Sequence, residues 1–267
     1  VESMYKYGKI LDDGNTENIE SAGHYYKLAA DHGHVASMVD YGKLVVGTSA
    51  TEACHYFKLS CEQGSAEGMR LYGSMLYEGR GVCEDKAESC RYYKMSADKG
   101  NNESLYQYGQ MLFKGDGITQ DKATGLQMIK AAADQGSDKA MYRYGIMLDK
   151  GEGVSQNKAE ACRYYKMAAE QGNDKAMLHY GLMLANGEGI EQNKEEACRY
   201  YKIAADKGNV SSMYNYGLML ANGDGVAVNL EEACHYFKLA ADQGNSKAMN
   251  NYGIMLANGE GVQQNKK

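Results

Sequence analysis

The sequence predicts an all-α solenoid of about seven helix-pair repeats with a 36-residue period. A Tyr-Gly pair recurs along the chain, and five of the seven steps between its glycines are 36 residues long. These glycines are Gly8, Gly42, Gly73, Gly109, Gly145, Gly181, Gly217 and Gly253. Apolar residues follow helical spacing within each unit, and the absence of proline suits helices joined by glycine turns.

The first helix of each unit, here called helix A, is clearest between residues 140 and 150. Ala140, Tyr144 and Leu148 are spaced by four residues and form one apolar face. Gly151 follows where a left-handed residue commonly ends a helix. Residues 152–154 are therefore expected to turn the chain.

The second helix, here called helix B, begins at Asn157. Glu160 follows three residues later, and this spacing is typical of a capping box. The predicted core face of this helix carries Ala161, Tyr165, Ala168 and Ala169. Gly172 is expected to terminate it. In other units the same N-cap position holds Asp85, Asp121, Asn193 and Asn229.

Two stretches depart from this pattern. The G-x-G-V turn is absent after Gly42, where residues 47–49 are expected to make a shorter connection, and residues 12–15 replace the same turn in the first unit. In the helix B expected at 121–135, Gly125 stands where other units have alanine. A glycine inside a helix costs about 1 kcal/mol relative to alanine. Either these substitutions make this helix the least stable of the middle units, or they reflect ordinary sequence drift between repeats.

Composition limits the kinds of partner. The net charge of −6 and the pI near 5.6 argue against nucleic acid as the main ligand, because phosphate binding needs a basic surface. No apolar run approaches the roughly 20 residues that span a bilayer. The expected partner is therefore a protein or peptide, with no nucleic acid and no membrane span, and the oligomeric state stays open.

The cysteines suggest a cellular compartment. Five of the seven share one repeat position, about 10 Å from one another if neighbouring helices pack normally. Disulfides need Cα atoms within about 7 Å, so reduced packing thiols and a cytoplasmic location are expected. The sequons at 102–104 and 209–211 point weakly to the alternative, the lumen of the secretory pathway.

No catalytic, cofactor or metal site is predicted. Each G-x-G turn, such as Gly151-Glu152-Gly153, follows a helix, whereas a dinucleotide fingerprint follows a strand. The histidines are scattered, and Cys54 and Cys61 lack the spacing of a zinc or redox pair. The chain is accordingly expected not to be an enzyme.

The residues of one unit carry a resemblance to a known family. The pattern A-M-Y-R-Y-G-I-M-L-x-x-G-x-G-V, followed by N-K-A-E-A-C-R-Y-Y-K-M-A-A-x-x-G, resembles the Sel1-like repeat, a relative of the tetratricopeptide repeat. This resemblance extends over residues 1–267 as a single array. It implies a right-handed α-α superhelix, and it implies an adaptor that assembles other proteins, with helix A lining the concave side.

The chain begins at Val1 and ends where a further helix B is expected to begin, so it is expected to be a segment of a longer protein. That leaves an alternative function. The array is then a regulatory or substrate-docking region, for example of a kinase or a ubiquitin-ligase complex, with the catalytic domain outside this chain. A third hypothesis is a purely structural spacer.

Two positions of helix A vary between units and are therefore not required for packing. They lie two residues before and one residue after the glycine, and share one helix face. In the later units the second position forms an aliphatic row, Ile146, Leu182, Leu218 and Ile254. Two interpretations stay open: a peptide-binding groove, or burial between successive A helices. The predicted partner-binding residues are Lys6, Asp40, Gln107, Tyr142, Arg143, Ile146, Leu178, His179, Leu182, Tyr214, Asn215 and Leu218.

Overall fold

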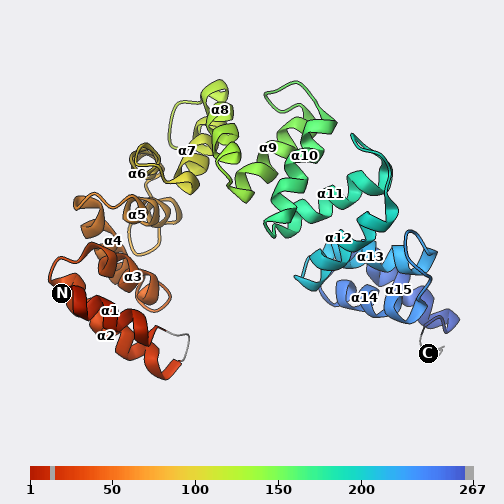
Figure 1. Ribbon diagram of the computed structural model, residues 1–267, viewed down its shortest axis with the longest axis horizontal. Coiled ribbons are helices and arrows are strands. Elements are labelled where there is room, and N and C mark those ends of the chain that lie inside the picture. Colours follow the sequence, from red (N-terminus) through yellow and green to blue (C-terminus); the bar gives the residue numbers. More distant parts are fainter. Residues whose placement is uncertain (13–15, 262–267) are drawn as a thin grey trace. The chain divides into compact units, whose positions relative to one another are not determined.

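The computed structural model describes residues 1–12 and 16–261, and within these ranges the chain forms fifteen helices and no strand. The chain divides into two compact units, Val1–Gln135 and Gly136–Lys267, each of which is described by itself. The connection predicted at 12–15 lies largely outside the described residues. The prediction of an all-α array of about seven helix pairs is confirmed (Figure 1).

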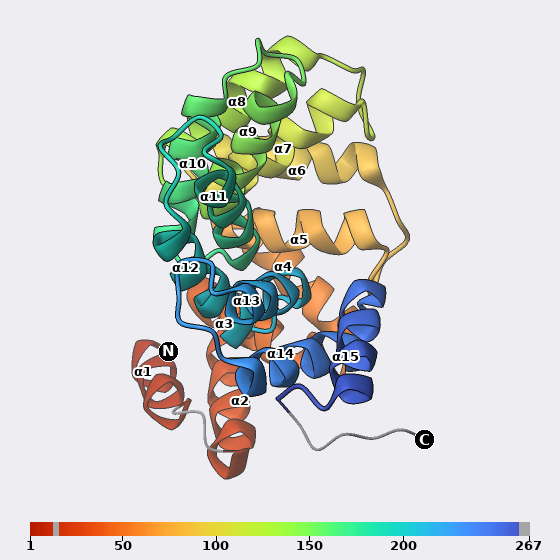
Figure 2. The same ribbon diagram turned by 90° about the vertical axis from the view of Figure 1, so that its right-hand side faces the viewer.

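In both units the odd-numbered helices are A helices and the even-numbered helices are B helices. Unit 1 contains α1 (Glu2–Leu11), α2 (Thr16–Asp31), α3 (Val35–Val45), α4 (Ala50–Glu62), α5 (Ala66–Glu78), α6 (Lys86–Asp98), α7 (Asn102–Lys114) and α8 (Lys122–Asp134). Unit 2 contains α9 (Asp138–Lys150), α10 (Lys158–Glu170), α11 (Asp174–Asn186), α12 (Lys194–Asp206), α13 (Val210–Asn222), α14 (Leu230–Asp242) and α15 (Ser246–Asn258). Within each unit, consecutive helices pack side by side (Figure 2).

The helix ends follow the sequence signals. The Asn157 Oδ1 accepts the backbone N–H of Glu160 at 3.0 Å, and Gly151 ends α9 in the left-handed region at φ 72°. The shorter connection predicted at 47–49 is also confirmed. There α3 ends at Val45, and Ser49 caps α4 by accepting the N–H of Glu52.

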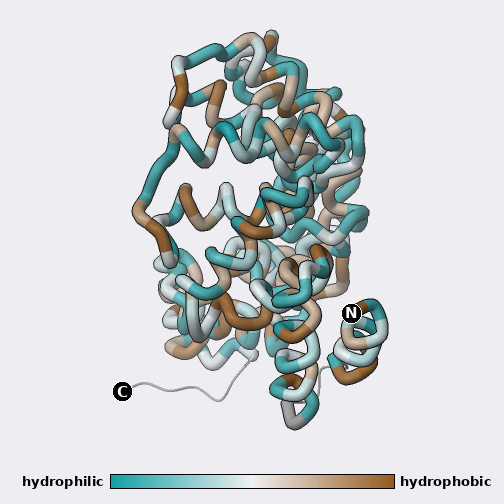
Figure 3. The backbone as a smooth tube through the Cα atoms, turned by 90° about the vertical axis from the view of Figure 1, so that its left-hand side faces the viewer, coloured by the Kyte–Doolittle hydropathy of each residue, from teal (hydrophilic) through white to brown (hydrophobic). Residues whose placement is uncertain are grey.

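The recurring Tyr-Gly pair has a packing cause. A Cβ on Gly145 would lie 2.8 Å from the Tyr165 ring of the following helix, and a Cβ on Gly42 would lie 2.5 Å from the Phe57 ring. Only glycine leaves room for an aromatic ring of helix B against the backbone of helix A. Hydrophobic and hydrophilic residues are interspersed along the helices, as in amphipathic helices that bury one face (Figure 3).

Gly125 in α8 also has a packing role. This helix lacks the usual aromatic ring, and Ile129 stands in its place. A Cβ on Gly125 would lie 2.5 Å from the backbone nitrogen of Phe113 in α7. Because Ile129 is smaller than the aromatic ring of the other units, α7 and α8 pack closer together. The mid-helix glycine leaves room for this closer packing.

The G-x-G turns connect one repeat to the next. Gly189 lies over the first residue of α10, so that a Cβ there would be 2.5 Å from the backbone of Lys158. The same lysine pairs with Glu188 of that turn. At the other end of the repeat, Asn173 donates from Nδ2 to the Asp138 carboxylate at 2.9 Å. These contacts hold successive A helices of unit 2 in fixed register.

Candidate partner-binding surface

The aliphatic row, defined as Ile146, Leu182, Leu218 and Ile254, lies on α9, α11, α13 and α15 of unit 2. Leu182 is 36% exposed and Ile254 is 49% exposed, while Ile146 and Leu218 are partly buried. By contrast, Leu184 and Leu220 on the same helices are 1% exposed. Leu182 and Ile254 therefore lie on the surface of unit 2 and are not buried between A helices, whereas Ile146 and Leu218 are partly covered.

Three hollows adjoin the row. The central hollow, of about 520 Å³, is bounded by Leu182, Ala185, Asn186, Gln192, Lys194, Tyr201, Asn215, Leu218, Met219, Asn222 and Asp224. The lateral hollow, of about 440 Å³, is bounded by Leu178, Leu182, Ser211, Tyr214, Asn215 and residues 244–247. The distal hollow, of about 240 Å³, is bounded by Leu218, Ala221, Asn222, Leu230, Phe237, Asn251, Ile254, Met255 and Glu260.

These hollows share walls. The central and lateral hollows share Leu182 and Asn215, and the central and distal hollows share Leu218 and Asn222. They therefore form a continuous track across α11, α13 and α15. The charged groups at the central hollow, Lys194 and Asp224, form an ion pair at 2.6 Å and leave the track close to neutral there.

Five of the predicted residues lie together on this track: Leu178, Leu182, Tyr214, Asn215 and Leu218. The amide of Asn215 borders two hollows and has no hydrogen-bond partner in the part of the chain that the structure describes. An amide offers both a donor and an acceptor, so Asn215 can bind either group of a peptide bond.

Tyr142, Arg143 and His179 are engaged with neighbouring residues. The His179 ring stacks on Tyr165 with ring centroids 5.1 Å apart, and Tyr142 lies 5.5 Å from the same imidazole. Burial lowers the pKa of His179 from its ordinary value. Arg143 donates from Nη2 to Glu152 at 2.9 Å. These three side chains cover the interior of their repeat.

The predicted residues of unit 1 form no comparable track. Lys6 pairs with Glu2 on the exposed face of α1, and Asp40 accepts from Lys9 at 2.9 Å. Gln107 donates to Glu103 and borders a cavity of only about 80 Å³. Their side chains are taken up by hydrogen bonds and ion pairs within the chain.

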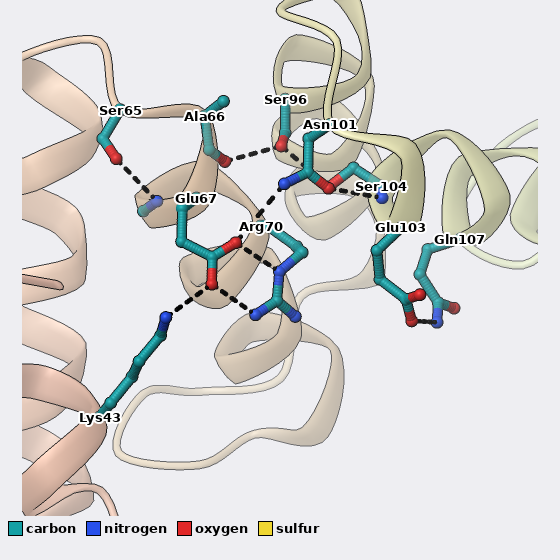
Figure 4. Close-up of polar contacts among 11 residues, drawn as sticks. Lys43, Ser65, Ala66, Glu67, Arg70, Ser96, Asn101, Glu103, Ser104 and Gln107 are labelled. Atoms are coloured by element: carbon teal, nitrogen blue, oxygen red, sulfur yellow. Dashed lines mark hydrogen bonds and ion pairs between the residues drawn. The ribbon is translucent and has the colours of Figure 1, made fainter. Parts of the chain in front are cut away.

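Unit 1 contains a polar cluster centred on Glu67 that the sequence did not reveal (Figure 4). The Glu67 carboxylate accepts from Arg70 Nε and Nη2 at 2.8 and 2.9 Å and pairs with Lys43 at 2.9 Å. Burial raises the pKa of Glu67, but Arg70 and Lys43 outweigh it and lower this pKa to about 2. The i, i+3 spacing of Glu67 and Arg70 is a sequence signal, whereas the pairing with Lys43 needs the packing of α3 on α5.

The seven cysteines are unpaired, and six of them are buried, as expected for packing thiols. Burial raises the pKa of Cys162 to about 11. In the described ranges no group of three or more His, Cys, Asp or Glu side chains is arranged to hold a metal ion. None of the helices in those ranges is long and apolar enough to cross a membrane.

One family model matches every part of the chain. The model described as Sel1 repeat matches residues 1–34, 35–65, 66–101, 102–137, 138–173, 174–209, 210–245 and 246–267. No curated protein matches the chain.

Solved structures show the same fold. One is c5321, a protective antigen of uropathogenic Escherichia coli strains displaying an SLR fold, with 28% identity and a TM-score of 0.79 over 89% of this chain and 52% of the antigen. The chain thus spans about half the length of that protein. A Sel1 repeat protein from Oxalobacter formigenes is 29% identical with a TM-score of 0.77, over 85% of this chain and 94% of that one. The immunity protein Pa5087 from Pseudomonas aeruginosa, 15% identical over 78% of this chain and 81% of its own, has a TM-score of 0.55 and shares the fold alone.

Proposed function

Because this chain belongs to the Sel1 repeat family, we propose that it is a non-catalytic scaffold that binds an extended segment of a partner protein along the track of unit 2. Proteins of this family generally act in protein–protein interaction. The residues assigned to the track are Leu178, Leu182, Tyr214, Asn215, Leu218 and Ile254. The unpaired cysteines support a reducing compartment such as the cytoplasm.

The observation that carries the proposal is the aliphatic row itself. Each A helix of unit 2 contributes one branched aliphatic side chain at the same repeat position, of which Leu182 and Ile254 are exposed and the other two are partly buried. Exposed apolar side chains that line connected hollows are typical of interaction sites. An extended segment inserts alternate side chains into such hollows, and neighbouring amides bind its backbone.

The first experiment compares two variants of the same chemistry and similar exposure. Leu182→Asp alters the track, whereas Ile203→Asp alters an aliphatic residue of α12 that is 39% exposed and lies outside the hollows. Proteins captured from native lysate by the unaltered chain and by each variant are quantified by mass spectrometry. Circular dichroism confirms that each variant is folded.

We expect Leu182→Asp to lose one specific protein by roughly 30-fold, as for an interface hot spot worth about 2 kcal/mol, and Ile203→Asp to retain it. A charge placed in an apolar contact is left without compensation, which is the reason for the loss. Equal capture by both variants, with both folded, would show that the track does not bind the partner.

A further inference from the structure

Among the described residues, asparagine caps four A helices, and in three of them the cap also binds a carboxylate. The Oδ1 of the cap accepts a backbone N–H of its own helix, and the Nδ2 donates to an acidic residue in the first turn of the preceding A helix. The three pairs, with their N···O distances, are Asn101–Glu67 (3.4 Å), Asn173–Asp138 (2.9 Å) and Asn209–Asp174 (2.8 Å). Figure 4 shows the first of them. The place beside an asparagine cap is therefore a carboxylate site within this fold.

The fourth asparagine cap, Asn245 of α15, has no such carboxylate. Its Oδ1 accepts the N–H of Ala248 at 3.0 Å, as the other caps do in their helices. The repeat position of Asp138 and Asp174 is occupied in α13 by Val210, which has no acceptor for Nδ2. The first turn of α13 holds no acidic residue. This repeat thus keeps the amide of the cap and lacks the carboxylate that the amide binds in the earlier repeats.

The lateral hollow opens at this place. Its volume is about 440 Å³, and Asn245, Ser246 and Lys247 border it on the side of α15. Ser211 of α13 is also part of its wall. These side chains offer hydrogen-bond donors, and the lysine adds a positive charge. No aspartate or glutamate of the described residues borders the hollow, and Lys247 is exposed and forms no ion pair with any of them.

The apolar side of the lateral hollow belongs to the track. Leu182 borders both the lateral and the central hollow, and Leu178 and Tyr214 complete the apolar wall of the lateral one. At the central hollow the ion pair between Lys194 and Asp224 leaves no net charge. The positive charge of the track is therefore concentrated at the lateral hollow, next to an exposed leucine.

We infer that the lateral hollow holds the carboxylate of an acidic side chain, aspartate or glutamate, from the bound partner segment. This carboxylate takes the place that Asp174 occupies beside Asn209 one repeat earlier. There it accepts a hydrogen bond from Asn245 Nδ2 and pairs with Lys247. Charge-assisted hydrogen bonds of this kind are stronger than bonds between neutral groups. Alternate side chains of an extended segment point to the same side, so an apolar residue two positions from the acid reaches Leu182. This inference rests on the proposed function and specifies the chemistry of its partner.

The test compares two pentapeptides, Leu-Ala-Asp-Ala-Leu and Leu-Ala-Asn-Ala-Leu, both N-acetylated and C-amidated so that the aspartate carries the only charge. Backbone amide signals of residues 245–247 and the methyl signals of Leu182 are followed by NMR during titration of the intact chain. We expect the aspartate peptide to bind about tenfold more tightly at low salt, and the difference to shrink at about 1 M NaCl, because salt screens exposed charges. Equal affinity of the two peptides, or binding of neither at millimolar concentration, would overturn the inference.

Three variants make the test specific, and circular dichroism confirms that each is folded. Val210→Asp restores the carboxylate of the earlier repeats and should reduce the affinity for the aspartate peptide to that for the asparagine peptide. Val228→Asp adds the same charge at a side chain that is 59% exposed and lies outside the hollows, so it should leave the preference unchanged. Asn245→Ser keeps a helix cap, as Ser137 caps α9, but removes Nδ2 and should lower the preference about threefold. A full preference for the aspartate peptide in folded Val210→Asp or Asn245→Ser would contradict the assignment.

The outcome is separable from that of the lysate experiment. If Leu182→Asp loses a partner and the two peptides bind equally, the track binds protein but the lateral hollow does not select an acid. If the aspartate peptide is preferred as expected and no protein is lost from Leu182→Asp, the carboxylate site exists and the scaffold function of the track is wrong.

Discussion

In three of the four A helices of unit 1 the residue that follows the glycine is polar and bonded to a neighbour, whereas in α11, α13 and α15 of unit 2 the same position is aliphatic and borders a hollow. Lys9 pairs with Asp40, Lys43 pairs with Glu67, and the Ser74 hydroxyl donates to Glu78. In unit 2 no such pairing is available, because Leu182 and Leu218 carry no polar group.

The difference shows which positions of the repeat are free to vary. The glycine, the helix-B aromatic and the caps are nearly the same in both units because they build the helix pair. The position after the glycine does not build the pair, so its chemistry can change without changing the fold. In unit 1 Lys9 and Lys43 at this position pair with the following A helix, whereas the aliphatic residues of unit 2 at this position form no ion pair.

The largest expected effect separates core from surface within α13. Leu220 is 1% exposed, so Leu220→Ala should lower the free energy of unfolding by about 2–5 kcal/mol, through lost burial and a new cavity. Leu218→Ala, two residues earlier, should cost less than about 1 kcal/mol because Leu218 borders open hollows. Urea denaturation followed by circular dichroism measures both. Similar losses for the two variants would place Leu218 in the core and remove the distinction between the units.

A smaller effect tests the shared scaffold. A Cβ on Gly217 would lie 2.8 Å from the Phe237 ring, so Gly217→Ala should destabilise the fold by about 1–3 kcal/mol through overpacking. Gly253 occupies the same repeat position, but no atom of the described residues lies within 4 Å of a Cβ built there. Gly253→Ala should therefore stabilise the chain by up to about 1 kcal/mol, since alanine suits a helix interior better. Destabilisation by both substitutions in the same urea titration would mean that helix geometry, rather than the aromatic contact, requires this glycine.

Much of the scaffold is predictable from sequence because its determinants are local and repeated. Gly151 and Asn157 mark the end of one helix and the start of the next, and both act as expected. The aliphatic row could also be identified from the sequence, because the same position can be compared in successive repeats.

The rest depends on contacts between helices. The sequence placed His179 at the edge of a groove, but whether it faces solvent or Tyr165 depends on how α11 packs on α10, and the structure stacks it on that ring. Likewise, the lateral hollow exists only because Leu178 of α11 and Asn215 of α13 are brought to the same place by the packing of two different helices. No local signal carries that information.

The smallest predicted effect concerns the polar contacts that distinguish unit 1. The pKa of Glu67 lies near 2 in the folded chain, below its ordinary value of 4.5, because Arg70 and Lys43 favour the carboxylate. The ionised group therefore stabilises the fold above about pH 4.5, and this contribution is lost as the pH falls from there toward 2. Since the Glu67 side chain is 35% exposed, solvent screens the pairs and the contribution should be on the order of 1 kcal/mol.

Urea denaturation at a series of pH values should show a smaller loss of the free energy of unfolding between pH 4.5 and 2 for Glu67→Gln than for the unaltered chain. Lys43→Met should lie between them, because Arg70 still binds the carboxylate. Identical pH profiles for all three proteins would mean that these ion pairs do not stabilise unit 1. The residues after the helix-A glycine would then differ between the two units in polarity but not in their contribution to stability.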